Sequence, residues 1–327
     1  MSWASVVGNE PVVRLLAAQI RLGRVPHTAL LVGPEGVGKR HLAREWAKAL
    51  QCDAHSGDSC DRCPACRKVG EERHPDLILI QPEALPEATE ERRLKQIRID
   101  QIRRLESQVA LTPFEGRWKV GIVDGAEQMT EEAAHACLKL LEEPPERTVF
   151  ILISQAPHRL PATLVSRCHM IRCVPQGIDR VQRHLTEVER LDPAEAHRLA
   201  ISSGGRLGRA LALHRSGRLA SKNDALNQLL SAQQNGALEV PLGRAPREEV
   251  QEALEWYAGW WRDLLLLQLG GDSRWLIHPD RGKDLQRLLP ASPEELLDRI
   301  DRTYWIHGCV ERNVNLRTAL AALLADA

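Results

Sequence analysis

The sequence predicts an α/β domain built on a parallel sheet, followed by regions that are entirely helical. Short apolar runs alternate with amphipathic helical patterns up to about residue 175, and one of these runs ends in a glycine-rich loop. Such alternation is typical of a parallel sheet covered by helices on both faces. Beyond residue 175 nearly every segment has a helical pattern.

Five short apolar runs are the expected strands. The first, Thr28–Val32, leads into the glycine-rich turn and then into a helix over Lys39–Leu50. The later runs are Leu77–Ile80, Val120–Val123, Val149–Ile153 and a run ending near Ile171–Val174. Two more helices are expected between them: one at Ile99–Val109, and one with Thr130 as its N-cap that Pro144-Pro145 stops.

The length indicates more than one domain. The chain has 327 residues, whereas one hydrophobic core rarely grows beyond about 250–300 residues. We place the boundaries near residues 175 and 220, where the pattern changes and Ser216-Gly217 interrupts the helices. The expected domains are a base over residues 1–175, a small all-α lid over 176–219 and an all-α collar over 220–327.

The composition excludes some classes of function. Lys and Arg number 44 and Asp and Glu number 44, so the overall charge gives no reason to expect a strong DNA binder acting alone. No apolar run has the roughly 18 residues that a membrane span needs, and residues 1–4 lack the pattern of a signal peptide. We therefore expect a cytoplasmic protein with no membrane partner.

The loop after the first strand has the spacing of a phosphate-binding loop, G-x-x-x-x-G-K, and opens a helix. Glycines at Gly33, Gly36 and Gly38 let backbone N–H groups wrap around phosphate oxygens, and Lys39 is placed to neutralise them. These four residues are the candidate nucleotide-binding residues.

Two residues that ATP hydrolysis needs are missing. Arg40 stands where Ser or Thr would bind Mg²⁺, and a guanidinium offers only donors. The third apolar run delivers Asp124, which suits a metal-binding carboxylate, but Gly125 replaces the glutamate that would orient the attacking water. Glu127 is expected on the wrong side of the turn. The sequence therefore predicts no hydrolysis here, and leaves open whether ATP or ADP still docks.

Four of the eight cysteines lie within fifteen residues, directly after the loop helix. Cys52, Cys60, Cys63 and Cys66 supply the four thiolates of a closed tetrahedral Zn²⁺ site, which is structural rather than catalytic. The turn-forming residues between them suit a knuckle held by metal. Redox thiols and a base-reading zinc finger are the alternatives, and the second lacks a basic recognition helix.

Several further motifs complete the pattern: a cysteine insertion before His74-Pro75-Asp76, the run Ala136–Pro145 (ACLKLLEEPP), Ser166-Arg167-Cys168, and Arg312–Arg317 (RNVNLR). Together they resemble the clamp-loader AAA+ family of bacterial DNA polymerase III subunits. The resemblance covers most of the chain, densely over residues 1–175 and thinly over 220–310. It implies an AAA+ base with an inserted zinc module, an all-α lid and an all-α collar.

The resemblance also implies partners. Members of this family join gamma/tau ATPase subunits and a delta subunit in a five-membered ring, which loads the sliding clamp on primed DNA during replication. Contact with the primer–template stays open, because Arg98, Arg103 and Arg104 suit either a DNA-facing surface or a solvated helix face.

Arg167 is assigned by the resemblance as an arginine finger that acts in trans on a neighbour's ATP. A guanidinium beside the γ-phosphate stabilises the charge that develops during transfer. Arg167 follows Leu164-Val165, which we expect in a strand-like run. The alternative is a surface arginine paired with a local carboxylate.

An ATP-hydrolysing gamma/tau-like subunit is the competing function. Arg40 and Gly125 argue against it, and so does Gly208, which stands where an active member carries a phosphate-sensing arginine. Ser154 suits either a phosphate sensor or a local hydrogen bond. In the collar, Trp256, Tyr257, Trp260 and Trp261 have helical spacing, and we expect them to pack between helices.

Overall fold

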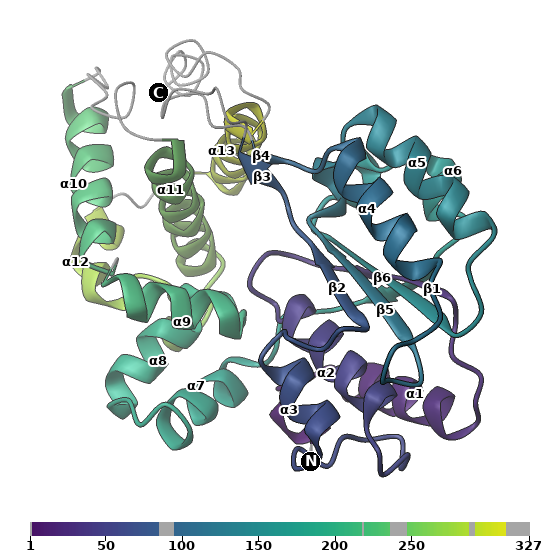
Figure 1. Cartoon of the computed structure of the whole chain (residues 1–327). Helices are drawn as coiled ribbons and strands as arrows, with labels where there is room; N and C mark the ends of the chain where they lie inside the picture. Colours follow the sequence, from purple (N-terminus) through teal and green to yellow (C-terminus); the bar gives the residue numbers. More distant parts are fainter. Residues whose placement is uncertain (1, 85–94, 218, 236–246, 288–291, 312–327) are drawn as a thin grey trace. The chain divides into compact units, whose positions relative to one another are not determined.

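The computed structural model describes residues 2–84, 95–217, 219–235, 247–287 and 292–311 (Figure 1). The chain forms two compact units: Met1–Leu191 with Gly204–Arg209, and Asp192–Ser203 with Ala210–Ala327. The division into base, lid and collar stays a prediction. Among the described residues, no helix is long and apolar enough to cross a membrane.

Five parallel strands form the sheet of the first unit, in the order β2-β5-β6-β1-β7. The strands are β1 (Thr28–Val32), β2 (Leu77–Ile80), β5 (Lys119–Asp124), β6 (Thr148–Ser154) and β7 (His169–Arg172). The register of β1 on β6 runs from Thr28 opposite Phe150 to Val32 opposite Ser154. A separate antiparallel pair joins β3 (Glu83–Ala84) to β4 (Lys95–Gln96). The predicted α/β base on a parallel sheet is confirmed.

Helices cover both faces of this sheet (Figure 1). They are α1 (Glu10–Arg21), α2 (Lys39–Gln51), α3 (Pro64–Gly70), α4 (Ile99–Val109), α5 (Glu131–Glu142) and α6 (Ala162–Val165). Helix α7 (Ile178–Glu187) follows the last strand in the chain. Successive strand residues alternate between two cores, because side chains in a strand point to opposite faces. Leu31 packs with α1 and α2, whereas Leu30 packs with α4 and α5.

Local sequence accounts for two helix ends. Thr130 caps α5 as expected, since its Oγ1 accepts a hydrogen bond from the N–H of Ala133 at 3.2 Å. The expectation of a strand-like run at Leu164-Val165 is wrong, because both residues lie in α6. Their N–H groups donate to the carbonyl of Pro161, whose ring restricts φ to a value that suits a helix start.

The short 3₁₀ helices of the first unit are η1 (Ser2–Ser5), η3 (Ala126–Gln128) and η4 (Pro157–Arg159). Helix α9 (Leu207–Ser216) begins in the first unit and continues into the second. The second unit otherwise contains α8 (Pro193–Ser202), α10 (Leu219–Asn235), α11 (Arg247–Gln268), η6 (Ser273–Trp275), η7 (Pro279–Arg281), α12 (Gly282–Arg287) and α13 (Pro293–Glu311).

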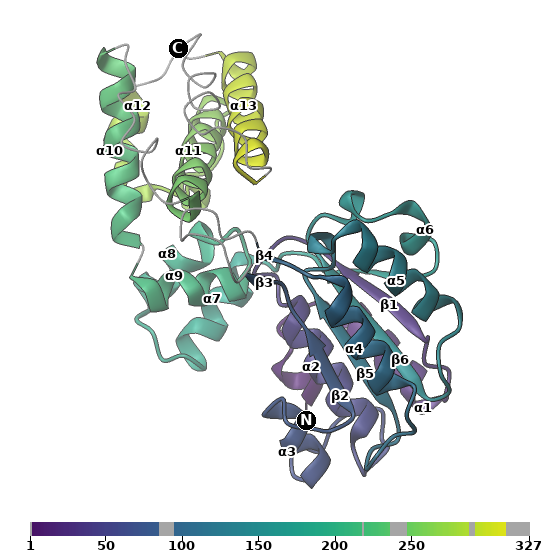
Figure 2. The ribbon, with the colours of Figure 1, turned by 45° about the horizontal axis from the view of Figure 1, so that its top comes forward.

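Helices α10, α11 and α13 lie side by side in the second unit (Figure 2). The aromatic cluster of α11 is buried, with none of its four side chains more than 4% exposed, as expected for helix packing. His278 packs edge-on against Trp256 and Trp260, and its Nδ1 lies 2.9 Å from Oδ2 of the buried Asp263.

Asp76, directly before β2, is fully buried and anchors the loop between α4 and β5. Its carboxylate accepts hydrogen bonds from the N–H groups of Phe114 (2.7 Å), Glu115 (3.0 Å) and Gly116 (2.7 Å). The ammonium of Lys119 lies 3.3 Å away. Burial acts to raise the pKa of Asp76, but the backbone donors and Lys119 outweigh it and hold that pKa below its ordinary value.

Asp76→Asn is expected to lower the free energy of unfolding of the first unit by about 3–5 kcal/mol, because it removes one partner of a buried ion pair. Urea denaturation measures this change, with the exposed Asp53→Asn as control. Since the folded-state pKa of Asp76 is depressed, its stabilisation is complete at neutral pH and is lost as the pH falls below about 3.9. Equal unfolding midpoints for the two variants at pH 7 would contradict this role.

Candidate functional site

The phosphate loop lies between β1 and α2, and its lysine is engaged by the loop itself. Lys39 is buried, and its Nζ donates to the carbonyl oxygens of Gly33 at 2.6 Å and Pro34 at 2.8 Å. Burial lowers the pKa of Lys39, although nearby acidic groups oppose the shift. The donors that a phosphate would use are therefore directed at backbone oxygens of the same chain.

The phosphate loop also has a backbone contact with the start of α9. The N–H of Gly208 donates to the carbonyl of Gly36 at 2.8 Å, and both residues belong to the first unit. A Cβ on Gly36 would lie 2.6 Å from the backbone nitrogen of Arg209, so only glycine fits this approach. Gly208, which the sequence aligns with a phosphate-sensing arginine, thus meets the loop through its backbone.

Arg40 stands beside the carboxylate that the sequence predicts as a metal ligand. Its NH1 lies 3.7 Å from Oδ2 of Asp124, and its NH2 lies 3.2 Å from both carboxylate oxygens of Glu72. Burial raises the pKa of Asp124, and the guanidinium of Arg40 opposes that shift. A cation of the chain itself is therefore paired with Asp124.

The expected position of Glu127, on the wrong side of the turn, stays a prediction. Gly125 has a φ of +81°, and this left-handed turn leads into η3. The Glu127 carboxylate is close enough to raise the pKa values of both Lys39 and Asp124. Its Oε1 accepts a hydrogen bond from the N–H of Gln155 at 3.3 Å.

Ser154 ends β6 and is buried. Its Oγ accepts a hydrogen bond from the N–H of Ala156 at 3.1 Å. Of the two interpretations that the sequence left open, the local hydrogen bond is the one present in the structure.

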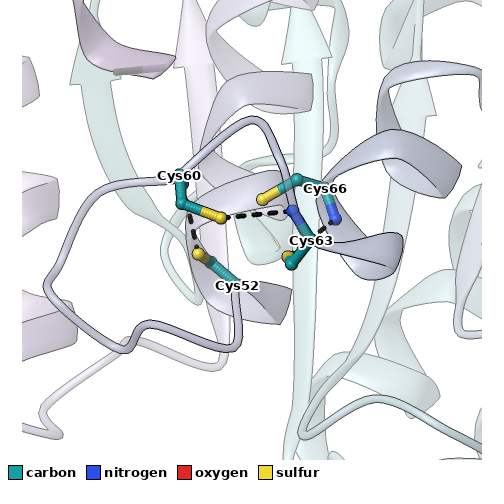
Figure 3. A group of neighbouring side chains, drawn as sticks. All are labelled: Cys52, Cys60, Cys63 and Cys66. Carbon is teal, nitrogen blue, oxygen red and sulfur yellow. Dashed lines mark hydrogen bonds between the residues drawn. The ribbon is translucent and has the colours of Figure 1, made fainter.

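The four cysteines of the insertion converge on one point (Figure 3). Cys52 follows the end of α2, and Cys63 caps the start of α3. Backbone N–H groups donate to sulfur from Cys60 to Cys52 at 3.2 Å, from Cys63 to Cys60 at 3.3 Å and from Cys66 to Cys63 at 3.4 Å. All four Sγ atoms lie within 4.8 Å of one another.

This arrangement fits a tetrahedral metal ion. Metal–sulfur bonds of about 2.3 Å place the sulfur atoms about 3.8 Å apart, so only a small closure is needed. The N–H groups of Arg62 and Cys63 lower the pKa of Cys60 to about 6, whereas burial raises that of Cys52. The four cysteines can therefore hold a metal ion.

Hydrogen bonds and ion pairs attach the cysteine module to the rest of the first unit. Lys48 on α2 pairs with Asp61 at 2.5 Å. The indole N–H of Trp3 donates to the carbonyl of Gly57 at 2.8 Å. On the other side, Lys68 on α3 pairs with Glu115, in the loop before β5, at 2.7 Å. The module is thus joined to the N-terminal residues, to α2 and to the loop before β5.

Arg167 lies between α6 and β7, and its side chain is 40% exposed. Its NH2 is 2.7 Å from Oε1 of Glu142, and its NH1 donates to the carbonyl of Thr163 at 2.9 Å. Within the single chain, Arg167 is thus a surface arginine paired with a local carboxylate, which was the alternative interpretation of the sequence. The trans-acting role of Arg167 stays a prediction, and the motif Arg312–Arg317 lies outside the described residues.

Comparison with known proteins identifies relatives among the subunits of bacterial DNA polymerase III. Residues 8–176 match the family described as DNA polymerase III, delta subunit. The chain is 34% identical to DNA polymerase III subunit delta' of Pseudomonas aeruginosa over 265 residues, covering 80% of this chain and 78% of that protein. It is 27% identical to the Bacillus subtilis delta' subunit, covering 99% and 98%. The tau subunit of Escherichia coli is 32% identical over 65% of this chain and 32% of its own length.

Proposed function

The chain belongs to the DNA polymerase III delta-subunit family, and we propose that it acts as a delta' clamp-loader subunit that does not hydrolyse ATP itself. Its delta' character follows from the relatives. Two delta' subunits match 80% and 99% of the chain, whereas the E. coli tau subunit matches 65%.

The contact between Arg40 and Asp124 carries the proposal of an inert site. Phosphoryl transfer depends on Mg²⁺ held by the loop Ser or Thr and a carboxylate, and on a residue that orients water. Here a guanidinium pairs with the carboxylate and offers no lone pair to a metal. Lys39, directed at Gly33 and Pro34, supports the same conclusion. This site is therefore not expected to hydrolyse ATP.

One observation favours the alternative of a gamma/tau-like ATPase. The Glu127 carboxylate acts to raise the pKa values of Lys39 and Asp124, and a carboxylate near these residues is suited to orient water. Arg40 opposes this alternative, because the site still lacks a ligand that would bring Mg²⁺ to the phosphates. Turnover by the chain alone that is lost on Glu127→Gln would favour the alternative.

Arg167 is the residue we assign to catalysis in trans. It is exposed, and its contacts with Glu142 and Thr163 leave other N–H donors of the guanidinium free for a phosphate. The partners proposed on this basis are gamma/tau ATPase subunits and a delta subunit in a five-membered ring. The sliding clamp is reached through that complex, and primer–template DNA is a further proposed contact.

Zinc is the metal we propose for the four cysteines. Four thiolates with no open coordination position suit structural Zn²⁺. Bound zinc would hold α3 and residues 52–66 together. The contacts of Lys48, Trp3 and Lys68 would then fix this segment against the rest of the first unit.

Arg167→Ala is expected to leave assembly unchanged and to lower ATP hydrolysis at the neighbouring site by about 10³-fold or more. The measurement is steady-state hydrolysis by the chain alone and by the assembled complex with gamma/tau and delta partners. Arg73→Ala serves as control, because Arg73 is also an exposed, ion-paired arginine. Unchanged hydrolysis with Arg167→Ala would contradict the trans role, and the chain alone should show no turnover.

The purified chain is expected to contain one zinc ion, measured by atomic emission. Cys63→Ser should lose it, whereas Cys168→Ser, outside the cluster, should keep it. Chelation should increase amide exchange over residues 52–70 and leave the sheet protected, because the metal orders a segment without its own core. Stoichiometric zinc in the Cys63→Ser variant would contradict this assignment.

A further inference from the structure

The guanidinium of Arg167 is held at both of its terminal nitrogens by the chain that carries it. Oε1 of Glu142 lies 2.7 Å from NH2, and the carbonyl of Thr163 accepts from NH1 at 2.9 Å. Glu142 ends α5, and Thr163 lies in α6. Because one contact is made at each terminal nitrogen, the two contacts together restrict the orientation of the guanidinium plane.

Both acceptors come from well-anchored positions. Leu141, which precedes Glu142, is buried in the core between the sheet and α4 and α5. Leu164, which follows Thr163, is buried in the same core. The two residues that orient Arg167 are therefore each next to a buried residue of the core, although the arginine itself is exposed.

These contacts do not exhaust the donors of the arginine. A guanidinium presents five N–H groups, and one acceptor at each terminal nitrogen leaves Nε–H and one N–H on each of the two others. A guanidinium held in this way still has N–H donors for a phosphate, while its rotation is restricted.

We propose that Glu142 is a positioning residue for Arg167: it fixes the guanidinium in the free chain, so that the arginine need not be ordered when a neighbouring ATP site meets it. This inference rests on the proposed trans role of Arg167. Pre-ordering a side chain favours a contact because the entropy of ordering it is not lost at the moment of reaction.

The pair is not a stability device. The side chains of Arg167 and Glu142 are 40% and 48% exposed, and ion pairs with such exposure contribute little to the free energy of unfolding. Loss of Glu142 should therefore leave the unfolding midpoint unchanged and appear only in the kinetics of the assembled complex.

The test uses the full complex with its gamma/tau and delta partners and measures kcat and KM for ATP. Glu142→Ala is expected to lower kcat at the site that Arg167 serves by about tenfold, since a free arginine side chain must then be ordered in each turnover. The KM for ATP should stay unchanged. Glu142→Gln should retain part of the activity, because the amide oxygen still offers an acceptor near NH2 although the charge of the ion pair is lost. Glu143→Ala, a neighbouring exposed glutamate, is the matched control and should equal the wild type.

A double variant separates positioning from a structural effect. With Arg167→Ala already present, Glu142→Ala should change nothing further. An additional loss in that background would overturn the inference, and so would a rise in kcat with Glu142→Ala alone, which would mean that Glu142 competes with phosphate for the arginine. If Arg167→Ala lowers hydrolysis and Glu142→Ala behaves like Glu143→Ala, only the inference fails. If Arg167→Ala itself has no effect, the proposed function fails.

Discussion

Lys39 donates two hydrogen bonds to the backbone of its own loop, and Arg40, the next residue, pairs with Asp124. In an active site of this kind the lysine binds phosphate and the carboxylate binds a metal. Here the lysine donates to backbone oxygens of its own loop, and the carboxylate is paired with Arg40. The N–H of Gly208 also donates to the carbonyl of Gly36 in the loop. The groups that would bind a nucleotide and its metal thus have partners within the chain.

The residue that we propose for catalysis lies away from the chain's own loop. Arg167 is exposed and held by Glu142 and Thr163. The four cysteines can hold a metal ion, and contacts of Trp3, Lys48 and Lys68 join this segment to the rest of the first unit. We propose that a subunit with these properties contributes to hydrolysis through a neighbour.

The sheet and the metal cluster were predictable from sequence because their signals are local. Strands such as Thr28–Val32 are buried on both faces and appear as continuous apolar runs. The four cysteines lie close together in the chain, so their spacing alone indicates convergence. The aromatic positions of α11 are likewise buried as the helical spacing indicates.

The remaining features depend on contacts between distant residues or on backbone turns. Glu72 reaches Arg40 and Glu142 reaches Arg167, and neither pair leaves a periodic pattern in the sequence, although Glu142 lies in a motif that was recognised. Leu164-Val165 was assigned to a strand because two apolar residues are too few to distinguish a strand from one turn of helix.

We infer that Arg40 takes the place of the metal beside Asp124 at the phosphate loop. A calorimetric titration of the isolated chain with ATP, with and without Mg²⁺, tests this directly. Because Arg40 pairs with Asp124, we expect any binding to be weak and equal in the two conditions. If Mg²⁺ strengthens binding by about tenfold, which corresponds to about 1.4 kcal/mol, a metal displaces Arg40 and the inference is wrong.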